Sequence, residues 1–208
     1  DLQADLNFTL EDAEQMPKFG YQHFATTTTY GDSSKTACGG MDTAKLVAGT
    51  PYHNVASAQS MWLNCKDHGN CWCSKDGGGG GTVGMGCLSC AKGRFLKSSY
   101  GVRHKAIFSL SETEASEGDE TDSGSPFATE EVVIVVGDLC PTLGNDDWCP
   151  RHPGERNAYG SLHHFDFSHP PKSIWGYANG ARNFNFVFTK IPCPAVLRQR
   201  FQAHSACR

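Results

Sequence analysis

Long hydrophobic runs and an excess of positive charge are both missing from this sequence. No stretch of the 208 residues approaches the roughly 18 consecutive apolar residues of a membrane-spanning helix. Lys and Arg number 18 against 22 Asp and Glu, and the net charge of -4 gives a nucleic-acid partner no electrostatic support. The chain starts at Asp1 rather than Met, so we expect that a signal peptide has been removed.

Two motifs of common enzyme classes are also missing. The five consecutive glycines at 77–81 do not end in Gly-Lys-Ser/Thr, which excludes a phosphate-binding loop. The nine histidines do not show the helical HxxxH spacing of a metalloprotease. We therefore expect no cofactor and no metal ion.

Cysteine, in contrast, is abundant. An even count of ten at this density indicates an oxidising compartment and up to five disulfide bonds, whose pairing the sequence leaves open. A zinc ribbon is the alternative, but Cys71 and Cys73 are separated by one residue where such sites use two or more. Asn7 begins a sequon for N-glycosylation, which fits a secreted protein. The cysteines are Cys38, Cys65, Cys71, Cys73, Cys87, Cys90, Cys140, Cys149, Cys193 and Cys207.

The length and pattern predict one mainly β domain over 1–208. Expected strands are apolar, aromatic or β-branched segments, at 24–30, 132–136, 162–168 and 184–189. A helix is expected at 54–64, because Val55, Ala58, Met61 and Trp62 fall near one helical face. Three segments are expected to lie outside the core: an N-terminal arm at 1–20, an acidic exposed insertion at 111–131 and a C-terminal tail at 194–208.

Asp166 is the first candidate catalytic residue. In an alternating strand it shares one face with His164, while the phenylalanines on either side of it face the core. Asp is rare in strands, and partial desolvation favours the protonated carboxyl group that a general acid needs. An exposed Asp paired with Lys or Arg is the alternative. Asp138 and Asp32, each at the end of an expected strand, are further candidates, and each could instead be a turn residue.

Several aromatic side chains could bind sugar rings, whose C–H faces stack on Trp and Tyr. Core packing is the alternative for each of them, and for Trp62 above all. The candidates are Tyr30, Trp62, Trp72, Trp148 and Trp175.

Together these motifs resemble glycoside hydrolase family 45, and its mollusc-like branch more than the fungal one. Residues 28–39 (TTYGDSSKTACG) and 164–166 (HFD) resemble the two family signatures. Residues 137–141 (GDLCP), 147–149 (DWC) and 159–160 (YG) resemble stretches of the mollusc-like branch.

The resemblance implies a six-stranded double-psi β-barrel with short helices and long disulfide-stapled loops. It implies an enzyme that cuts internal β-1,4-glucosidic bonds of cellulose or β-glucan with inversion. We expect this enzyme to be secreted and monomeric. By position, Asp166 matches the general acid and Asp32 the general base, while Thr28, Tyr30 and His164 match substrate-binding positions. Asp138 occupies the position that is thought to serve as base in a branch lacking the first Asp, so both assignments of the base stay open.

Two other classes compete with the hydrolase. An expansin-like or barwin-like protein would share the barrel and bind wall polysaccharide without cutting it, but too few residues follow Asp166 for the second domain usual in expansins. A cysteine-rich inhibitor would explain the disulfides and leave the two carboxylate motifs unexplained.

Overall fold

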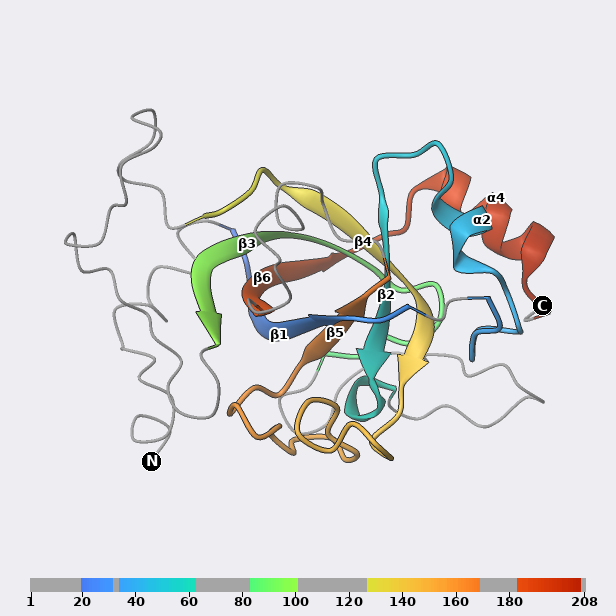
Figure 1. Ribbon diagram of the computed structural model, residues 1–208. Helices are drawn as coiled ribbons and strands as arrows, with labels where there is room; N and C mark the ends of the chain where they lie inside the picture. Colours follow the sequence, from blue (N-terminus) through green and yellow to red (C-terminus); the bar gives the residue numbers. More distant parts are fainter. Residues whose placement is uncertain (1–19, 32–33, 63–82, 101–126, 169–182, 207–208) are drawn as a thin grey trace.

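The computed structural model describes residues 20–31, 34–62, 83–100, 127–168 and 183–206 (Figure 1). Six strands form a closed barrel in the order β1-β5-β2-β4-β3-β6. They are β1 (His23–Thr29), β2 (His53–Ala58), β3 (Cys90–Tyr100), β4 (Val132–Cys140), β5 (His164–Phe167) and β6 (Asn183–Ile191). The barrel confirms the predicted fold class, and four of its strands overlap the expected ones.

The barrel wall contains both parallel and antiparallel strand pairs. β1 pairs with β5 and β2 with β4 in parallel, whereas β5 and β2 are antiparallel to each other. β6 and β3 complete the barrel with antiparallel pairs to β1, to β4 and to each other. Strands distant in the sequence therefore become neighbours, and β5 lies between β1 and β2.

Phenylalanine fills the barrel. Alternation along β5 and β6 sends every second side chain inward, where rings of Phe95 and Phe186 lie 4.9 Å apart and those of Phe165 and Phe188 lie 5.1 Å apart. Gly93 of β3 is required beside them, because a Cβ atom there would collide with the Val187 carbonyl oxygen and the Phe186 ring. The outer face of β5 is left for polar side chains.

The helix expected at 54–64 is wrong. These residues form β2 and then a single 3-10 turn, η1 (Gln59–Met61). β2 lies between β4 and β5 and is buried along nearly all of its length. A strand buried on both faces is as apolar as a buried helix, so spacing does not distinguish the two over so few residues.

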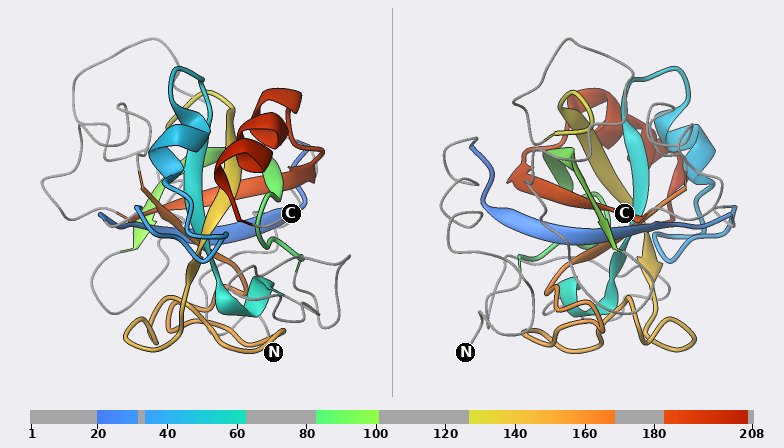
Figure 2. Two further views of the ribbon diagram at one scale, coloured as in Figure 1. Left: turned by 90° about the vertical axis from the view of Figure 1, so that its right-hand side faces the viewer. Right: turned by 60° about the vertical axis from the view of Figure 1, so that its left-hand side comes forward.

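Two α-helices lie side by side at one flank of the barrel (Figures 1 and 2). They are α2 (Thr43–Val47) and α4 (Ala195–His204). Leu46 of α2 and Leu197 and Phe201 of α4 are buried. The segment expected as a tail is thus largely a helix packed on the domain. Across the described ranges, no helix has the length and apolar character needed to cross a bilayer.

Three disulfide bonds hold the described part of the chain together. Cys38 bonds to Cys87, Cys90 to Cys193 and Cys140 to Cys149. They confirm the disulfide interpretation for six of the ten cysteines. Four cysteines lie outside the described residues: Cys65, Cys71, Cys73 and Cys207.

Most of the predicted arm and of the acidic insertion also lies outside the described residues, as does Asn7. The described end of the insertion turns back onto the barrel, where Phe127 is buried and bridges to Leu96. Glu130 and Glu131 that follow are exposed.

Candidate active site

Two of the three predicted carboxylates lie in one row across the barrel wall. Asp166 of β5 is aligned with Ala56 of β2, and Ala56 is aligned with Asp138 of β4. Aligned residues on neighbouring strands point to the same face, and two strand spacings separate the two Asp Cα atoms by about 10 Å. Thr28 of β1 continues the row on the other side of Asp166. Since Phe165 and Phe167 point into the core, this row lies on the outer face.

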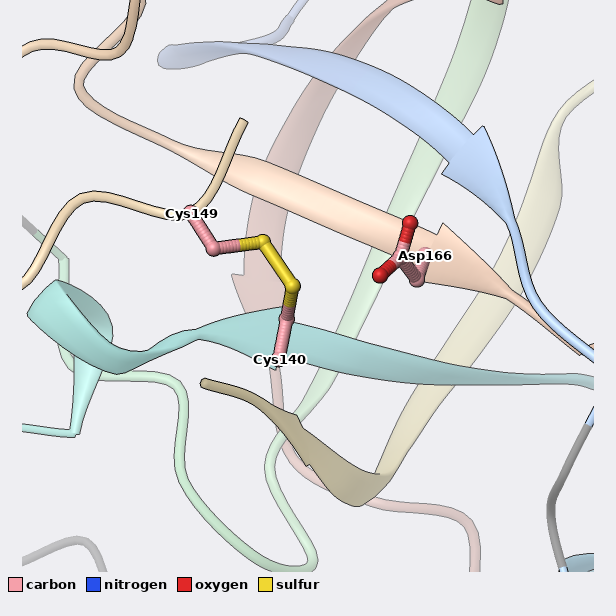
Figure 3. A group of neighbouring side chains, drawn as sticks. All are labelled: Cys140, Cys149 and Asp166. Carbon is pink, nitrogen blue, oxygen red and sulfur yellow. A yellow bond between two sulfur atoms is a disulfide. The ribbon is translucent and has the colours of Figure 1, made fainter. Parts of the chain in front are cut away.

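Asp166 is nearly enclosed. Its side chain is 14% exposed, and its Oδ1 lies 3.2 Å from Nε2 of His164, which is fully buried. The Thr28 hydroxyl lies 2.9 Å from the same nitrogen. Figure 3 shows the carboxylate beside the Cys140–Cys149 disulfide, and a carboxylate oxygen and both sulfurs lie within 4.8 Å of one another. The alternative of an exposed strand Asp paired with Lys or Arg does not describe these surroundings.

That cluster of two cysteines and an aspartate also has the residue types of a metal site. It is the group of potential ligands that the described residues bring together. Its sulfurs are bonded to each other, however, and a disulfide does not supply the thiolates that bind zinc.

Asp138 is held against the backbone. Its Oδ1 accepts hydrogen bonds from the amides of Ala37 and Leu139, each 2.8 Å long. Asp138 thereby ties the end of β4 to the loop that follows β1. A register shift between β2 and β4 brings it into line with Ala56, and Gly137 occupies this shift because a Cβ there would collide with Asn54 Oδ1.

A second row of polar side chains, Tyr30, Ser168 and Asn54, lies two residues along from Thr28, Asp166 and Ala56. Asn54 Nδ2 donates to the Tyr30 hydroxyl at 3.0 Å and to the Ser168 hydroxyl at 3.2 Å. Tyr30 is therefore linked through Asn54 to Ser168, two residues after Asp166. Asp32, two residues beyond Tyr30, lies outside the described residues.

The predicted tryptophans fall into three situations. Trp148 is partly exposed, 5.4 Å from the His164 ring, and it stacks on Tyr159 at 4.0 Å. Trp62 is buried and its Nε1 donates to Ser57 at 2.7 Å, which favours core packing. Trp72 and Trp175 lie outside the described residues. Sequence reasoning did not name Tyr159 as a binding residue, although its Tyr-Gly pair was part of the resemblance.

His163, directly before β5, is a buried histidine that links the site to a neighbouring loop. Its Nδ1 donates to the Phe24 carbonyl at 2.9 Å, and its Nε2 accepts from the Val83 amide at 3.2 Å. Burial lowers the pKa of His163 from its ordinary value of 6.5 to about 4. A protonated ring would lose the Val83 bond, since Nε2 would then be a donor.

This histidine predicts a loss of stability in acid. Because the folded pKa lies below the unfolded one, the contribution of His163 is complete above about pH 6.5 and falls as the pH approaches 4. The loss amounts to roughly 3 kcal/mol of unfolding free energy. Urea unfolding at pH 7 and at pH 4 measures it. A His163→Gln variant should lose less between these two pH values, and an equal loss in both proteins would contradict the prediction.

Comparison with known proteins gives three results. The family model described as EXPB1-like domain 1 matches residues 21–198. The chain is 28% identical to Endoglucanase-5 of Hypocrea jecorina over 175 residues, which are 82% of this chain and 57% of that protein. Two crystal structures of GH45 endoglucanase EG27II in complex with cellobiose, one at pH 8.0 and one of a mutant, have TM-scores of 0.51 and 0.53. Their identities are 20% and 22%, and the matches cover 89% and 91% of this chain and 88% and 90% of theirs.

The fold is thus the double-psi barrel of the GH45 endoglucanases, and the resemblance noted from the sequence motifs is confirmed. The chain belongs to the EXPB1-like domain 1 family. It spans 57% of the length of the curated relative that it matches.

Proposed function

We propose that this chain is an endo-β-1,4-glucanase that hydrolyses internal bonds of cellulose or β-glucan with inversion. The observation that carries the proposal is Asp166 on the outer face of the barrel, with His164 Nε2 at its Oδ1 and with Thr28 and, across Ala56, Asp138 in the same row. The similarity to an endoglucanase supports the same activity. The disulfide bonds further support secretion, and we propose a monomer that needs no cofactor.

Asp166 acts as the general acid in this proposal. An inverting glycosidase needs one carboxylic acid that protonates the leaving oxygen. His164 engages Oδ1, so the second oxygen of Asp166 would deliver the proton. The disulfide beside the carboxyl group and the low exposure of the side chain limit the access of bulk water to it.

Asp32 is the favoured base. Inversion requires a second carboxylate about 6.5–9.5 Å from the acid, with a water molecule between them. Asp138 stands at a suitable place in the row, but its Oδ1 is engaged by two backbone amides. One of these belongs to Ala37, in the loop that begins near Asp32, so Asp138 would position the base rather than replace it.

Three substitutions separate these roles. Asp32→Ala should lower kcat by about 10²–10⁴-fold, because the water loses its base. Asp138→Ala removes the carboxylate and the acceptor of the two amide hydrogen bonds together. Asp138→Asn removes the carboxylate but keeps an oxygen that can accept both hydrogen bonds. If Asp138 positions the loop, the Asn variant should be much more active than the Ala variant. Near-wild-type activity of Asp32→Ala, with both Asp138 variants inactive, would reverse the assignment.

Aromatic side chains provide the proposed binding surface for the glucan. The stacked pair Trp148–Tyr159 borders His164 and thus the acid. Thr28 of β1 is aligned with Asp166, and Tyr30 follows β1 and bonds to Asn54. Trp175 remains a proposed contact from outside the described residues. A sugar ring could stack on these platforms while the scissile oxygen faces Asp166.

Release of reducing sugar from carboxymethyl cellulose and from soluble β-glucan tests the activity. Proton NMR of the first product tests inversion, since the α-anomer should appear before mutarotation. No release from any β-1,4-glucan would refute the hydrolase. If such a protein still bound the polysaccharide, the non-hydrolytic expansin-like alternative would replace it.

A further inference from the structure

Asn157 is a buried side chain, outside the barrel strands, whose four hydrogen bonds define its orientation. Its Oδ1 accepts from the backbone amides of Tyr159 and Ser161 at 3.1 and 2.9 Å. Backbone amides only donate, so this atom must be the oxygen and the other must be the NH₂ group. Nδ2 therefore donates to the Thr26 hydroxyl at 2.8 Å and to the Trp148 carbonyl at 3.1 Å.

Thr26 passes this direction on. The Thr26 hydroxyl oxygen accepts a hydrogen bond from Asn157, so the hydroxyl hydrogen is available to donate to another acceptor. His164 Nδ1 lies 2.7 Å from the Thr26 oxygen, whereas the His163 carbonyl lies 3.4 Å away. If Nδ1 carried the hydrogen and donated to Thr26, the Thr26 hydroxyl would be left with the His163 carbonyl at 3.4 Å, which is longer than an ordinary O–H···O hydrogen bond. The arrangement in which the hydroxyl donates to Nδ1 satisfies both groups better.

His164 is thereby held in one tautomer. Nδ1 accepts, so the proton is on Nε2, which faces Thr28 Oγ1 and Asp166 Oδ1. Thr26 and His164 are fully buried and Asn157 is 6% exposed, so water cannot readily take the place of a lost partner. The Nε2–H lies between Thr28 Oγ1 at 2.9 Å and Asp166 Oδ1 at 3.2 Å. The hydrogen bonds thus run from Asn157 through Thr26 to His164, whose Nε2–H faces Asp166 and Thr28 together.

We propose that Asn157 is a positioning residue for the acid, and that it acts through Thr26 by keeping the His164 Nε2–H aimed at Asp166. The inference rests on the proposed role of Asp166. When that carboxyl group gives its proton to the leaving oxygen, the carboxylate that forms meets a donor already in place. In the other tautomer it would meet a nitrogen lone pair instead.

A purely structural role would make a different prediction. Asn157 also pins the loop between β4 and β5 through Trp148, Tyr159 and Ser161. Loss of that function would lower stability and loosen the Trp148 platform, which should raise KM. Loss of the series of hydrogen bonds from Asn157 to Asp166 would lower kcat and change the pH dependence of kcat.

Thr26→Val is the main test, because it removes the hydroxyl at nearly constant volume and leaves Asn157 to hold its loop. We expect kcat on a soluble cello-oligosaccharide to fall about tenfold or more with little change in KM. Without the Thr26 hydroxyl, His164 can take the other tautomer, and the Asp166 carboxylate then loses the hydrogen bond from Nε2. The alkaline limb of the kcat profile should move to higher pH, because the carboxylate is less stabilised. Thr26→Ser should restore both.

Thr27→Val is the matched control. Thr27 is the next residue of the same strand, also buried, and its hydroxyl donates to the Phe184 carbonyl at 2.6 Å. The control loses a buried hydroxyl hydrogen bond on the same strand and leaves the hydrogen bonds from Asn157 to Asp166 in place. A pH profile of Thr26→Val that matches Thr27→Val would overturn the proposal.

Nitrogen-15 NMR of the histidine rings reads the tautomer without activity. The wild-type His164, assigned by comparison with His164→Gln, should carry its proton on Nε2. Asn157→Asp keeps the acceptor oxygen but reverses the direction of the hydrogen bonds. Thr26 would donate to the new carboxylate and would accept a hydrogen bond from His164 Nδ1. A proton should then appear on Nδ1 of His164, and its absence, or an Nδ1 proton in the wild type, would contradict the inference.

The role of Asp166 as the acid and the role of Asn157 as its positioning residue can be refuted separately. Full activity of Asp166→Asn would refute the acid and leave the NMR result standing. An inactive Asp166→Asn, combined with an unaltered pH profile and tautomer in Thr26→Val, would refute the role of Asn157 alone.

Discussion

Asp166→Asn should lower kcat on carboxymethyl cellulose or β-glucan by about 10²–10⁴-fold, the range typical of a lost general acid. Asn has nearly the same shape and can still accept a hydrogen bond from His164 Nε2. It has no acidic proton, so the leaving oxygen would depart as an alkoxide. KM should change little, because the binding surface is kept. Initial rates of reducing-sugar release measure the effect.

The control is Asp42→Asn. Asp42 caps α2 by accepting from the Ala44 amide at 2.9 Å, and Asn caps a helix equally well. Both variants remove one carboxylate, and both should unfold near the wild-type temperature. Comparable rates for the two variants would remove Asp166 from the mechanism.

Loss of the Cys140–Cys149 disulfide should lower kcat as well as stability. This bond closes a short loop, with a sequence separation of 9, and lies beside Asp166. The chain-entropy model predicts a loss of about 3 kcal/mol for such a loop. Paired Cys→Ala changes avoid a new hydroxyl next to the carboxylate. We expect kcat to fall about tenfold or more, because Asp166 would lose its neighbour and Trp148, next to Cys149, its anchor.

The Cys90–Cys193 bond is the matched comparison. It closes a loop with a separation of 103 and joins β3 to the segment before α4. The same model predicts a larger loss, about 5 kcal/mol, while kcat of the folded fraction should change less. The two double variants thus rank oppositely in unfolding free energy and in kcat. The same order in both measurements would show that the short disulfide has only a structural role near the acid.

Strand patterns were the most predictable part of the fold. The run at 132–136 and the alternating phenylalanines at 184–189 lie within β4 and β6. β3 was not predicted, because Cys90–Tyr100 mixes Gly, Lys and Arg with few apolar residues. Its pairing with β4 and β6 stabilises it instead. The helix expected at 54–64 is wrong for a related reason, since β2 takes its conformation from two neighbouring strands.

The sequence by itself determined which residue types could act: a carboxylate in mid-strand with a histidine two residues before it, and enough cysteines for a disulfide framework. Alternation already placed Asp166 and His164 on one face, because that relation is local to a single strand. The tertiary structure alone decided the rest. β2 brings Asp138 into line with Asp166, and Thr26 of β1 connects Asn157 to His164. Both relations depend on strand order and register, which arise from contacts between distant parts of the chain.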